Sequence, residues 1–219
     1  MNKEVVRCMF LKDKDIEYLK DRFSKEMINK VNINLYTKNI DCEYCREAEQ
    51  LMKELAQTSD KIELKVLNAI IDRDKIGREI DKTPMITVGS ERIVFSGIPA
   101  GYEFAVLVED IIEVSRSEPL LSPDSVEKIR KIDKPVDIKV FVTPTCPYCP
   151  RMVKYAHSAA LINPNIKAEM IEATEFPDLS NAYSVYGVPK TIINDAIEIE
   201  GAVPEENFVE ELLRACNIS

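Results

Sequence analysis

The chain contains two successive stretches in which apolar and polar residues follow one another in the same order. Short apolar runs predict strands, and runs with an apolar residue every three or four positions predict amphipathic helices. Each stretch is expected to form a leading helix followed by strand, helix, strand, helix, strand, strand and helix. The expected strands are 32–36, 62–67, 85–88 and 93–95, then 137–142, 166–171, 191–193 and 197–199. The expected helices are 14–27, 47–57, 73–80 and 104–114, then 124–132, 152–161, 178–186 and 208–216.

Particular residues recur between the two stretches at almost one displacement. The recurring pairs are Cys42 and Cys146 (104 residues apart), Pro84 and Pro189 (105 apart), and Gly97 and Gly201 (104 apart). Three residue types keep the same order, which chance would rarely produce, so we expect an internal repeat. The pattern predicts an α/β fold of two tandem units, 1–117 and 118–219, each with a four-stranded mixed sheet flanked by helices.

Composition narrows the class of protein. Hydrophobic residues make up 45% of the 219, which is enough to build a core. The formal net charge of −9 argues against broad nucleic-acid binding, which needs a basic face. The first eleven residues (MNKEVVRCMFL) are charged, and no segment is apolar for long enough to cross a bilayer. We therefore expect a cytoplasmic protein with neither a membrane nor a nucleic-acid partner.

Four of the six cysteines form two Cys-x-x-Cys pairs, Cys42 with Cys45 and Cys146 with Cys149. Each pair follows a predicted strand and opens a predicted helix, so its sulfur atoms are close enough to bridge. The unpaired N–H groups and the dipole of a helix N-terminus favour the thiolate of the first cysteine. That thiolate can attack a substrate disulfide, and the second cysteine can then resolve the mixed disulfide. In a reducing compartment such pairs indicate redox or metal chemistry.

The surroundings of the two pairs differ. In the second pair Pro147 follows the first cysteine and fits the first turn of a helix, where its missing N–H has no intrahelical acceptor. In the first pair Asp41 and Glu43 flank Cys42 and oppose its thiolate, whereas Arg46 favours it. We therefore expect the second pair to hold the stronger nucleophile.

A structural zinc site is the main chemical alternative, because four cysteines can hold one zinc ion. The two pairs are 104 residues apart, far beyond usual zinc-ribbon spacing, and the lone His157 extends neither motif. We expect no metal site, and we interpret His157 as an ordinary helix residue. Cys8 and Cys216 are expected to be buried thiols, although a bond between them stays open.

A proline precedes a predicted strand in both units. Thr83-Pro84 and Val188-Pro189 occupy matching places, which favours a cis bond that leaves a backbone edge free for a substrate chain. An ordinary trans proline at the start of a strand is the alternative. Gly97 is interpreted, like its counterpart in the second unit, as part of a plain turn.

These motifs resemble those of the glutaredoxin-like protein disulfide oxidoreductases of archaea and some bacteria, which consist of two thioredoxin-fold units in one chain. The resemblance covers nearly the whole length. It rests on Cys146-Pro147-Tyr148-Cys149, on the strand residues 140–142 (VFV) before it and on Gly187-Val188-Pro189 after it. Cys42-Glu43-Tyr44-Cys45 is a looser match.

The resemblance implies dithiol–disulfide exchange on protein disulfides and a role in cell redox homeostasis. It implies that Cys146 and Cys42 attack and that Cys149 and Cys45 resolve. It implies redox-active disulfides in place of a bound cofactor, and a thioredoxin-reductase-like electron donor. It also implies substrate contacts at the proline loops, where the first unit has Thr83 before Pro84 and the second has Val188 before Pro189. The two sites are therefore not expected to be equivalent.

A buried acid close to the cysteine pairs is not evident in the sequence. Thioredoxin-type sites often keep a buried acid six positions before the first cysteine, but Tyr36 and Val140 stand there in this chain. An assisting acid would have to come from elsewhere in the fold.

The tandem arrangement also resembles the N-terminal part of alkyl hydroperoxide reductase flavoproteins. An electron relay between a separate flavin-dependent reductase and a peroxiredoxin is therefore the alternative function, and a non-enzymatic zinc-stabilised scaffold is a third.

Overall fold

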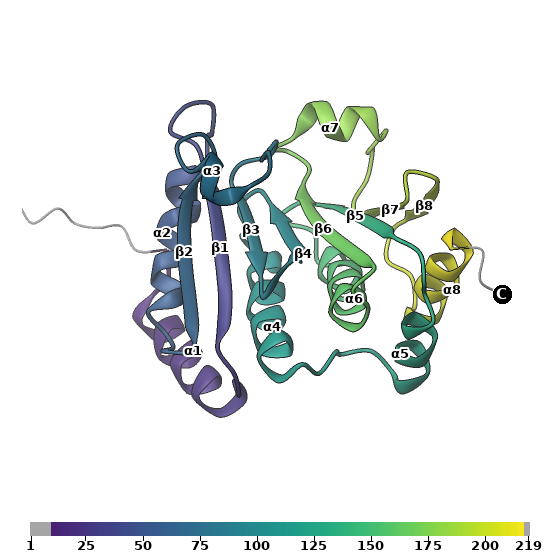
Figure 1. The fold of residues 1–219 in the computed structure, drawn as a ribbon, viewed down its shortest axis with the longest axis horizontal. Coiled ribbons are helices and arrows are strands. Elements are labelled where there is room, and N and C mark those ends of the chain that lie inside the picture. The colour runs from purple at the N-terminus through teal and green to yellow at the C-terminus, as the bar shows by residue number, and fades with distance from the viewer. Residues whose placement is uncertain (1–9, 217–219) are drawn as a thin grey trace, which may run out of the picture.

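The computed structural model describes residues 10–216. The apolar runs predicted as strands do form strands, because each has side chains to bury against helices. The first unit is drawn in purple to teal in Figure 1. Its helices are α1 (Asp13–Glu26), α2 (Cys45–Ala56), α3 (Arg73–Ile76) and α4 (Tyr102–Arg116). Its strands are β1 (Val31–Thr37), β2 (Ile62–Asn68), β3 (Met85–Val88) and β4 (Ser90–Ser96).

The second unit repeats this order in green to yellow. Ser122 caps its first helix by accepting a hydrogen bond from the N–H of Ser125, and Pro123 opens that helix, one residue before the expected start. The helices are α5 (Pro123–Arg130), α6 (Cys149–Ile162), α7 (Pro177–Ala182) and α8 (Glu205–Ala215). The strands are β5 (Val136–Val142), β6 (Ile166–Glu172), β7 (Lys190–Ile193) and β8 (Ile197–Glu200).

The eight strands form one continuous mixed sheet in the order β2-β1-β3-β4-β6-β5-β7-β8. Each unit contributes four neighbouring strands, and β4 joins β6 in parallel, with Phe95 opposite Met170. The tandem mixed α/β fold expected from the repeat is confirmed, but the joining of both sheets into one could not be expected from either unit alone. Following the pairings across the sheet shows that β1 and β5 run in the same direction. The loops after β1 and β5 therefore leave the sheet at one edge.

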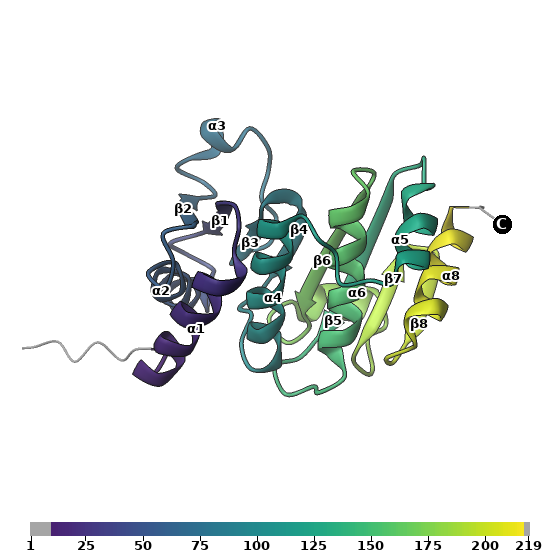
Figure 2. The same cartoon turned by 90° about the horizontal axis from the view of Figure 1, so that it is seen from below.

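Helices cover the sheet unequally. The large core cluster packs side chains of α1, α2, α4, α5, α6 and α8 against one face, and α4 and α6 lie side by side in its middle (Figure 2). Two small clusters cover the other face, one in each unit beside α3 and α7. No helix within residues 10–216 is both long and apolar enough to span a bilayer.

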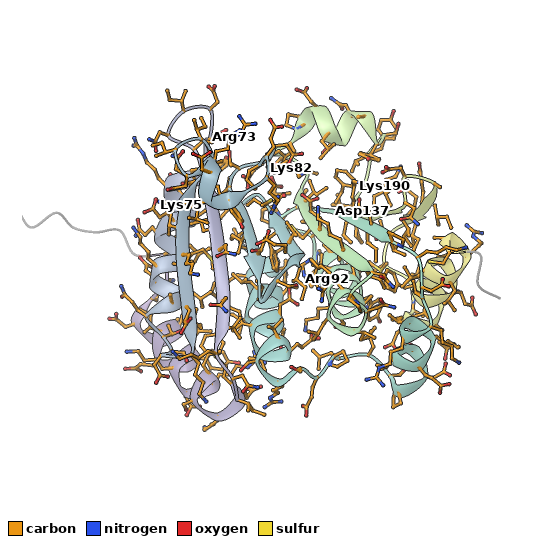
Figure 3. The ribbon with its side chains drawn as sticks, in the orientation of Figure 1. Arg73, Lys75, Lys82, Arg92, Asp137 and Lys190 are labelled. Atoms are coloured by element: carbon orange, nitrogen blue, oxygen red, sulfur yellow. A yellow bond between two sulfur atoms is a disulfide. The ribbon has the colours of Figure 1, made fainter. Side chains whose placement is uncertain are left out.

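Polar contacts bridge the two units on both sides of the β4–β6 junction. Figure 3 labels Lys82 and Arg92 in this region. The Lys82 ammonium lies 3.2 Å from the Glu169 carboxylate on β6, and Arg92 Nε donates to the carbonyl oxygen of Ala160 at 3.4 Å. Glu169, only 2% exposed, also accepts a hydrogen bond from the Ser96 hydroxyl. The junction is thus specified by buried polar groups as well as by strand pairing.

The interpretation of His157 as an ordinary helix residue is wrong. His157 is 1% exposed on α6 at the junction with α4. Its Nδ1 lies 2.6 Å from Asp110 Oδ2 and its Nε2 lies 3.2 Å from the Val94 carbonyl oxygen. Because a carbonyl oxygen can only accept, Nε2 donates to Val94, and Nδ1 and Asp110 share one further proton. The lone histidine is therefore a bridge between the two units.

Candidate redox centres

The two Cys-x-x-Cys pairs stand at the same edge of the sheet, after β1 and after β5. Both pairs are disulfides, Cys42 with Cys45 and Cys146 with Cys149, with Cα atoms 5.5 and 5.6 Å apart. In each unit the helix begins at the second cysteine rather than at the first. The first cysteine therefore lies just before the helix N-terminus, whose first backbone N–H groups have no intrahelical acceptor.

The second centre shows this arrangement directly. The N–H of Cys149 donates to Cys146 Sγ at 3.1 Å, and this contact would stabilise a Cys146 thiolate in the reduced enzyme. Cys146 is 8% exposed, whereas Cys149 is fully buried. Pro150 lies within the first turn of α6, where its missing N–H leaves no intrahelical bond unmade. The difference in burial agrees with the expected roles of an attacking and a resolving cysteine.

The first centre has the same order but a different neighbourhood. Cys42 is partly exposed, Cys45 is 4% exposed, and the N–H of Lys38 donates to Cys45 Sγ at 3.3 Å. A cavity of about 570 Å³ opens beside Cys42, and the Asp41 and Glu43 side chains line it. The acids that the sequence places beside this cysteine thus face the space through which a substrate would approach.

Both proline bonds are cis, Thr83-Pro84 and Val188-Pro189, as the matching positions predict. The carbonyl oxygen of Val188 lies 3.7 Å from Cys146 Sγ, so this loop borders the second centre. Thr83 lines the cavity beside Cys42 in the first. The structure thus brings each proline loop to its cysteine pair, while its contact with a substrate stays a prediction.

Residues of each unit also contact the redox centre of the other unit. The N–H of Tyr102, at the start of α4, donates to the carbonyl oxygen of Pro144 at 3.2 Å, two residues before Cys146. Gly101 has φ +60°, and a Cβ there would lie 2.2 Å from that oxygen, so a glycine is needed at this approach. The loop that carries the second centre is therefore positioned by the first unit.

The reverse contact is made at Gly97, whose interpretation as a plain turn is wrong. A Cβ at Gly97 would lie 2.6 Å from the Glu172 Cβ and 2.8 Å from Glu175 Oε1. Glu175, in the loop after β6, accepts the N–H of Ile98 at 2.6 Å and lines the cavity beside Cys42. Gly201 has no atom within 4 Å of such a Cβ, so its interpretation as a turn is consistent with the structure.

A buried carboxyl group that the sequence analysis missed lies at the start of α4, next to the contact between Tyr102 and the loop of the second centre. Glu103 follows Tyr102 on α4, is 2% exposed, and neither of its carboxyl oxygens has a hydrogen-bond partner among the described residues. Burial, together with the charge of the neighbouring Asp110, raises the pKa of Glu103 to about 8. The signal available in the sequence was an acidic residue directly before the apolar run 104–108, which opens the predicted helix 104–114.

One further cysteine lies within the described residues, outside both redox centres. Cys216 is a free thiol, 1% exposed, and burial raises its pKa. Its expected burial is confirmed, whereas Cys8 lies outside the described residues. Within residues 10–216 no group of three or more His, Cys, Asp or Glu side chains is arranged to hold a metal ion.

Comparison with known proteins agrees with this geometry. The family model of the thioredoxin domain matches residues 136–214. A protein disulfide oxidoreductase from Aeropyrum pernix K1 superposes with a TM-score of 0.89 at 29% identity, covering 95% of each chain. The alkylhydroperoxide reductase protein AhpF from Enterococcus faecalis superposes with a TM-score of 0.83 at 27% identity, covering 93% of this chain and all of that one. The chain is a tandem thioredoxin-fold protein. Each unit carries a Cys-x-x-Cys disulfide on this fold, which is the arrangement that thiol–disulfide exchange requires.

The curated relatives of this tandem thioredoxin-fold protein are longer chains. An alkyl hydroperoxide reductase chain from Pseudomonas aeruginosa is 26% identical over 172 residues, which are 78% of this chain and 32% of that one. An NADH dehydrogenase from Ferdinandcohnia aciditolerans is 26% identical over 166 residues, 74% of this chain and 30% of that one. The chain therefore spans about a third of the length of these relatives.

Proposed function

We propose that this protein exchanges dithiols and disulfides on protein substrates, with the second centre as the principal site. The observation that carries the proposal is the placing of both redox disulfides at one edge of the sheet, each beside a proline loop. The match with the disulfide oxidoreductase from A. pernix over nearly the whole of both chains supports it. We further propose 1–117 and 118–219 as the two units and the cytoplasm as the compartment.

The chemistry at the second centre follows from the positions of its two sulfur atoms. In the reduced enzyme the Cys146 thiolate attacks one sulfur of a substrate disulfide and displaces the other as a thiolate. Cys149 loses its proton and attacks Cys146 Sγ, which releases the second substrate thiolate and forms the observed Cys146–Cys149 disulfide. The substrate gains two electrons and two protons, and an external dithiol returns them to the enzyme. Val188 and Pro189 would hold the substrate backbone during the exchange.

The first centre is proposed to have an accessory role. Asp41 and Glu43 line its cavity, and their charges disfavour a thiolate at Cys42. Cys45 would resolve disulfides formed at Cys42, and Thr83 and Pro84 would contact the substrate there. A centre whose thiolate is disfavoured attacks more slowly, so we expect it to pass electrons or act on a narrower set of substrates.

A second candidate function is an electron relay from a separate flavin-dependent reductase to a peroxiredoxin. The likeness to the alkyl hydroperoxide reductase chains favours it, because they share this tandem fold. In both functions the redox-active disulfides carry the electrons. In the leading proposal a thioredoxin-reductase-like protein returns them.

The two functions are separated by turnover with two acceptors. We expect the wild-type protein to reduce an insulin-type disulfide with dithiothreitol as donor. A peroxiredoxin assay with the same donor is run in parallel. Turnover of peroxiredoxin without any reduction of insulin-type disulfides would replace the leading proposal with the relay.

We propose that Glu103 holds and returns the proton of Cys149. Glu103 follows Tyr102, which contacts the loop of the second centre, and its pKa of about 8 is close to that of a thiol, so transfer of a proton between the two groups costs little free energy. Glu103→Gln is expected to slow turnover by about 10²-fold at pH 7 and to remove an ionisation near pH 8 from its pH profile.

Stability measurements control for misfolding of this variant. Folding raises the pKa of Glu103 from 4.5 to about 8, so the native state retains a proton that the unfolded chain releases. Stability is therefore lost as pH rises from 4.5 through 8, and a glutamine there avoids this loss. Glu103→Gln should be at least as stable as wild type at pH 8. Slow turnover with an unchanged pH profile would mean that Glu103 has only a structural role.

A further inference from the structure

Two adjoining cavities beside the first centre are lined by carboxyl groups that the disulfide exchange does not use. The cavity beside Cys42 has a volume of about 570 Å³ and a smaller one has about 280 Å³. Tyr44 and Glu175 line both, so we describe them together as the acidic cavity. Carboxyl groups from both units line it, together with one basic residue, Lys38. The carboxyl groups are those of Asp41, Glu43, Glu47, Asp81, Glu172 and Glu175.

Two carboxyl oxygens of the smaller part have no partner among the described residues. Glu172 is 2% exposed, and its Oε2 accepts the Thr174 hydroxyl at 2.7 Å and the Glu175 N–H at 2.6 Å. Glu172 Oε1 has no hydrogen-bond partner, and neither has Glu47 Oε2. Burying a carboxylate oxygen without a hydrogen-bond donor is energetically costly. A bound molecule that donates hydrogen bonds to these oxygens would remove this cost.

The electrostatic environment favours a positively charged donor. Burial, together with the charges of Glu172 and Glu43, raises the pKa of Glu175 to about 7, and the hydrogen bond from Ile98 opposes this rise. Glu43, followed by Glu175 and Glu172, also raises the pKa of the Tyr44 phenol. The carboxyl groups thus repel one another around the point that a cation would occupy.

We propose that the acidic cavity binds a lysine or arginine side chain of the disulfide-bearing polypeptide while Cys42 reacts with its disulfide. The inference rests on the proposed function and adds a substrate preference to it. An ammonium offers three donors and a guanidinium five, which suits the unpartnered oxygens of Glu172 and Glu47. Because Glu172 and Glu175 come from the second unit, the first centre would be complete only in the tandem chain. The second centre has no acidic residue between Thr143 and Arg151, but Pro144 in its loop lines the smaller part of the cavity, so the test has to isolate the first centre.

The test uses a protein in which only the first centre can react, Cys146→Ser/Cys149→Ser. Its substrates are peptides with one intramolecular disulfide that differ only in the adjacent residue, Lys, Gln or Glu, with dithiothreitol as donor. We expect kcat/KM for the Lys peptide to be about tenfold above that for the Gln peptide, and the Glu peptide to be slowest. Glu172→Gln and Glu175→Gln should each reduce the Lys preference toward one.

A matched control and a binding measurement complete the design. Glu17, exposed on α1, lies outside the cavity, so Glu17→Gln should keep the preference. Calorimetry with peptides whose cysteines are replaced by serine measures binding without any exchange, and the Lys peptide should bind more tightly than the Gln peptide. Equal binding of the two, or a preference that survives both Glu172→Gln and Glu175→Gln, would overturn the proposal. Selective binding without turnover would instead count against redox activity at the first centre.

Discussion

Cys146→Ser is expected to lower insulin-type disulfide reduction by at least about 10³-fold, because a serine hydroxyl can neither attack a disulfide nor form one. Cys42→Ser is expected to keep at least about half of the activity. The difference follows from the two environments. The Cys149 N–H lies 3.1 Å from Cys146 Sγ, whereas carboxylates line the cavity beside Cys42. The measurement is the initial rate with dithiothreitol as donor.

Cys149→Ser is the matched variant, because it leaves the attacking thiol and removes the resolving one. It should accumulate a mixed disulfide between Cys146 and the substrate, detectable as a mass increase that dithiothreitol reverses. Equal losses in Cys146→Ser and Cys42→Ser would show that electrons pass through both centres in series. A greater loss in Cys42→Ser would reverse the proposed order of the two centres.

The sequence predicted the parts of the fold that depend on local patterns. The period of apolar positions found the strands to within a few residues, and β3 matches the expected 85–88. The polar helices were placed less well, because 73–80 and 178–186 have little apolar surface to mark their ends. There α3 is only Arg73–Ile76 and α7 ends at Ala182.

Contacts between the units could not be read from the sequence, because they join residues far apart in the chain. The pairing of β4 with β6 and the approach of Glu175 to the first centre depend on how two complete units meet. The sequence did, however, contain an indication that polar groups are buried between the units. Asp110 and Glu113 occupy positions in the predicted helix 104–114 that are otherwise apolar, and both are buried.

The same junction positions groups at both redox centres. It holds Tyr102 against the Pro144 carbonyl oxygen before the second centre and Glu175 beside the first. Each centre therefore loses a contacting residue if the two units separate. Groups that hold the junction should therefore influence both centres without touching a cysteine.

Asp110→Ala is expected to destabilise the protein by about 3–5 kcal/mol, because it leaves the buried Nδ1 of His157 without the carboxyl group that it contacts. For a chain of this size that corresponds to a fall in Tm of roughly 10 °C. Burial raises the pKa of Asp110, and the charge and hydrogen bond of His157 oppose that rise. The pair is thus stable only while a proton lies between Asp110 and Nδ1.

Asp110→Asn is the matched control for this prediction. A neutral His157 can accept an N–H of the introduced amide at Nδ1 while its Nε2 still donates to the Val94 carbonyl oxygen, so the loss should be about 1 kcal/mol. Thermal unfolding followed by circular dichroism at pH 7 compares the two variants with wild type. Similar small losses in both would show that the pair contributes little to the junction. A large loss in the alanine variant alone would show that one buried histidine contact stabilises the junction on which both redox centres depend.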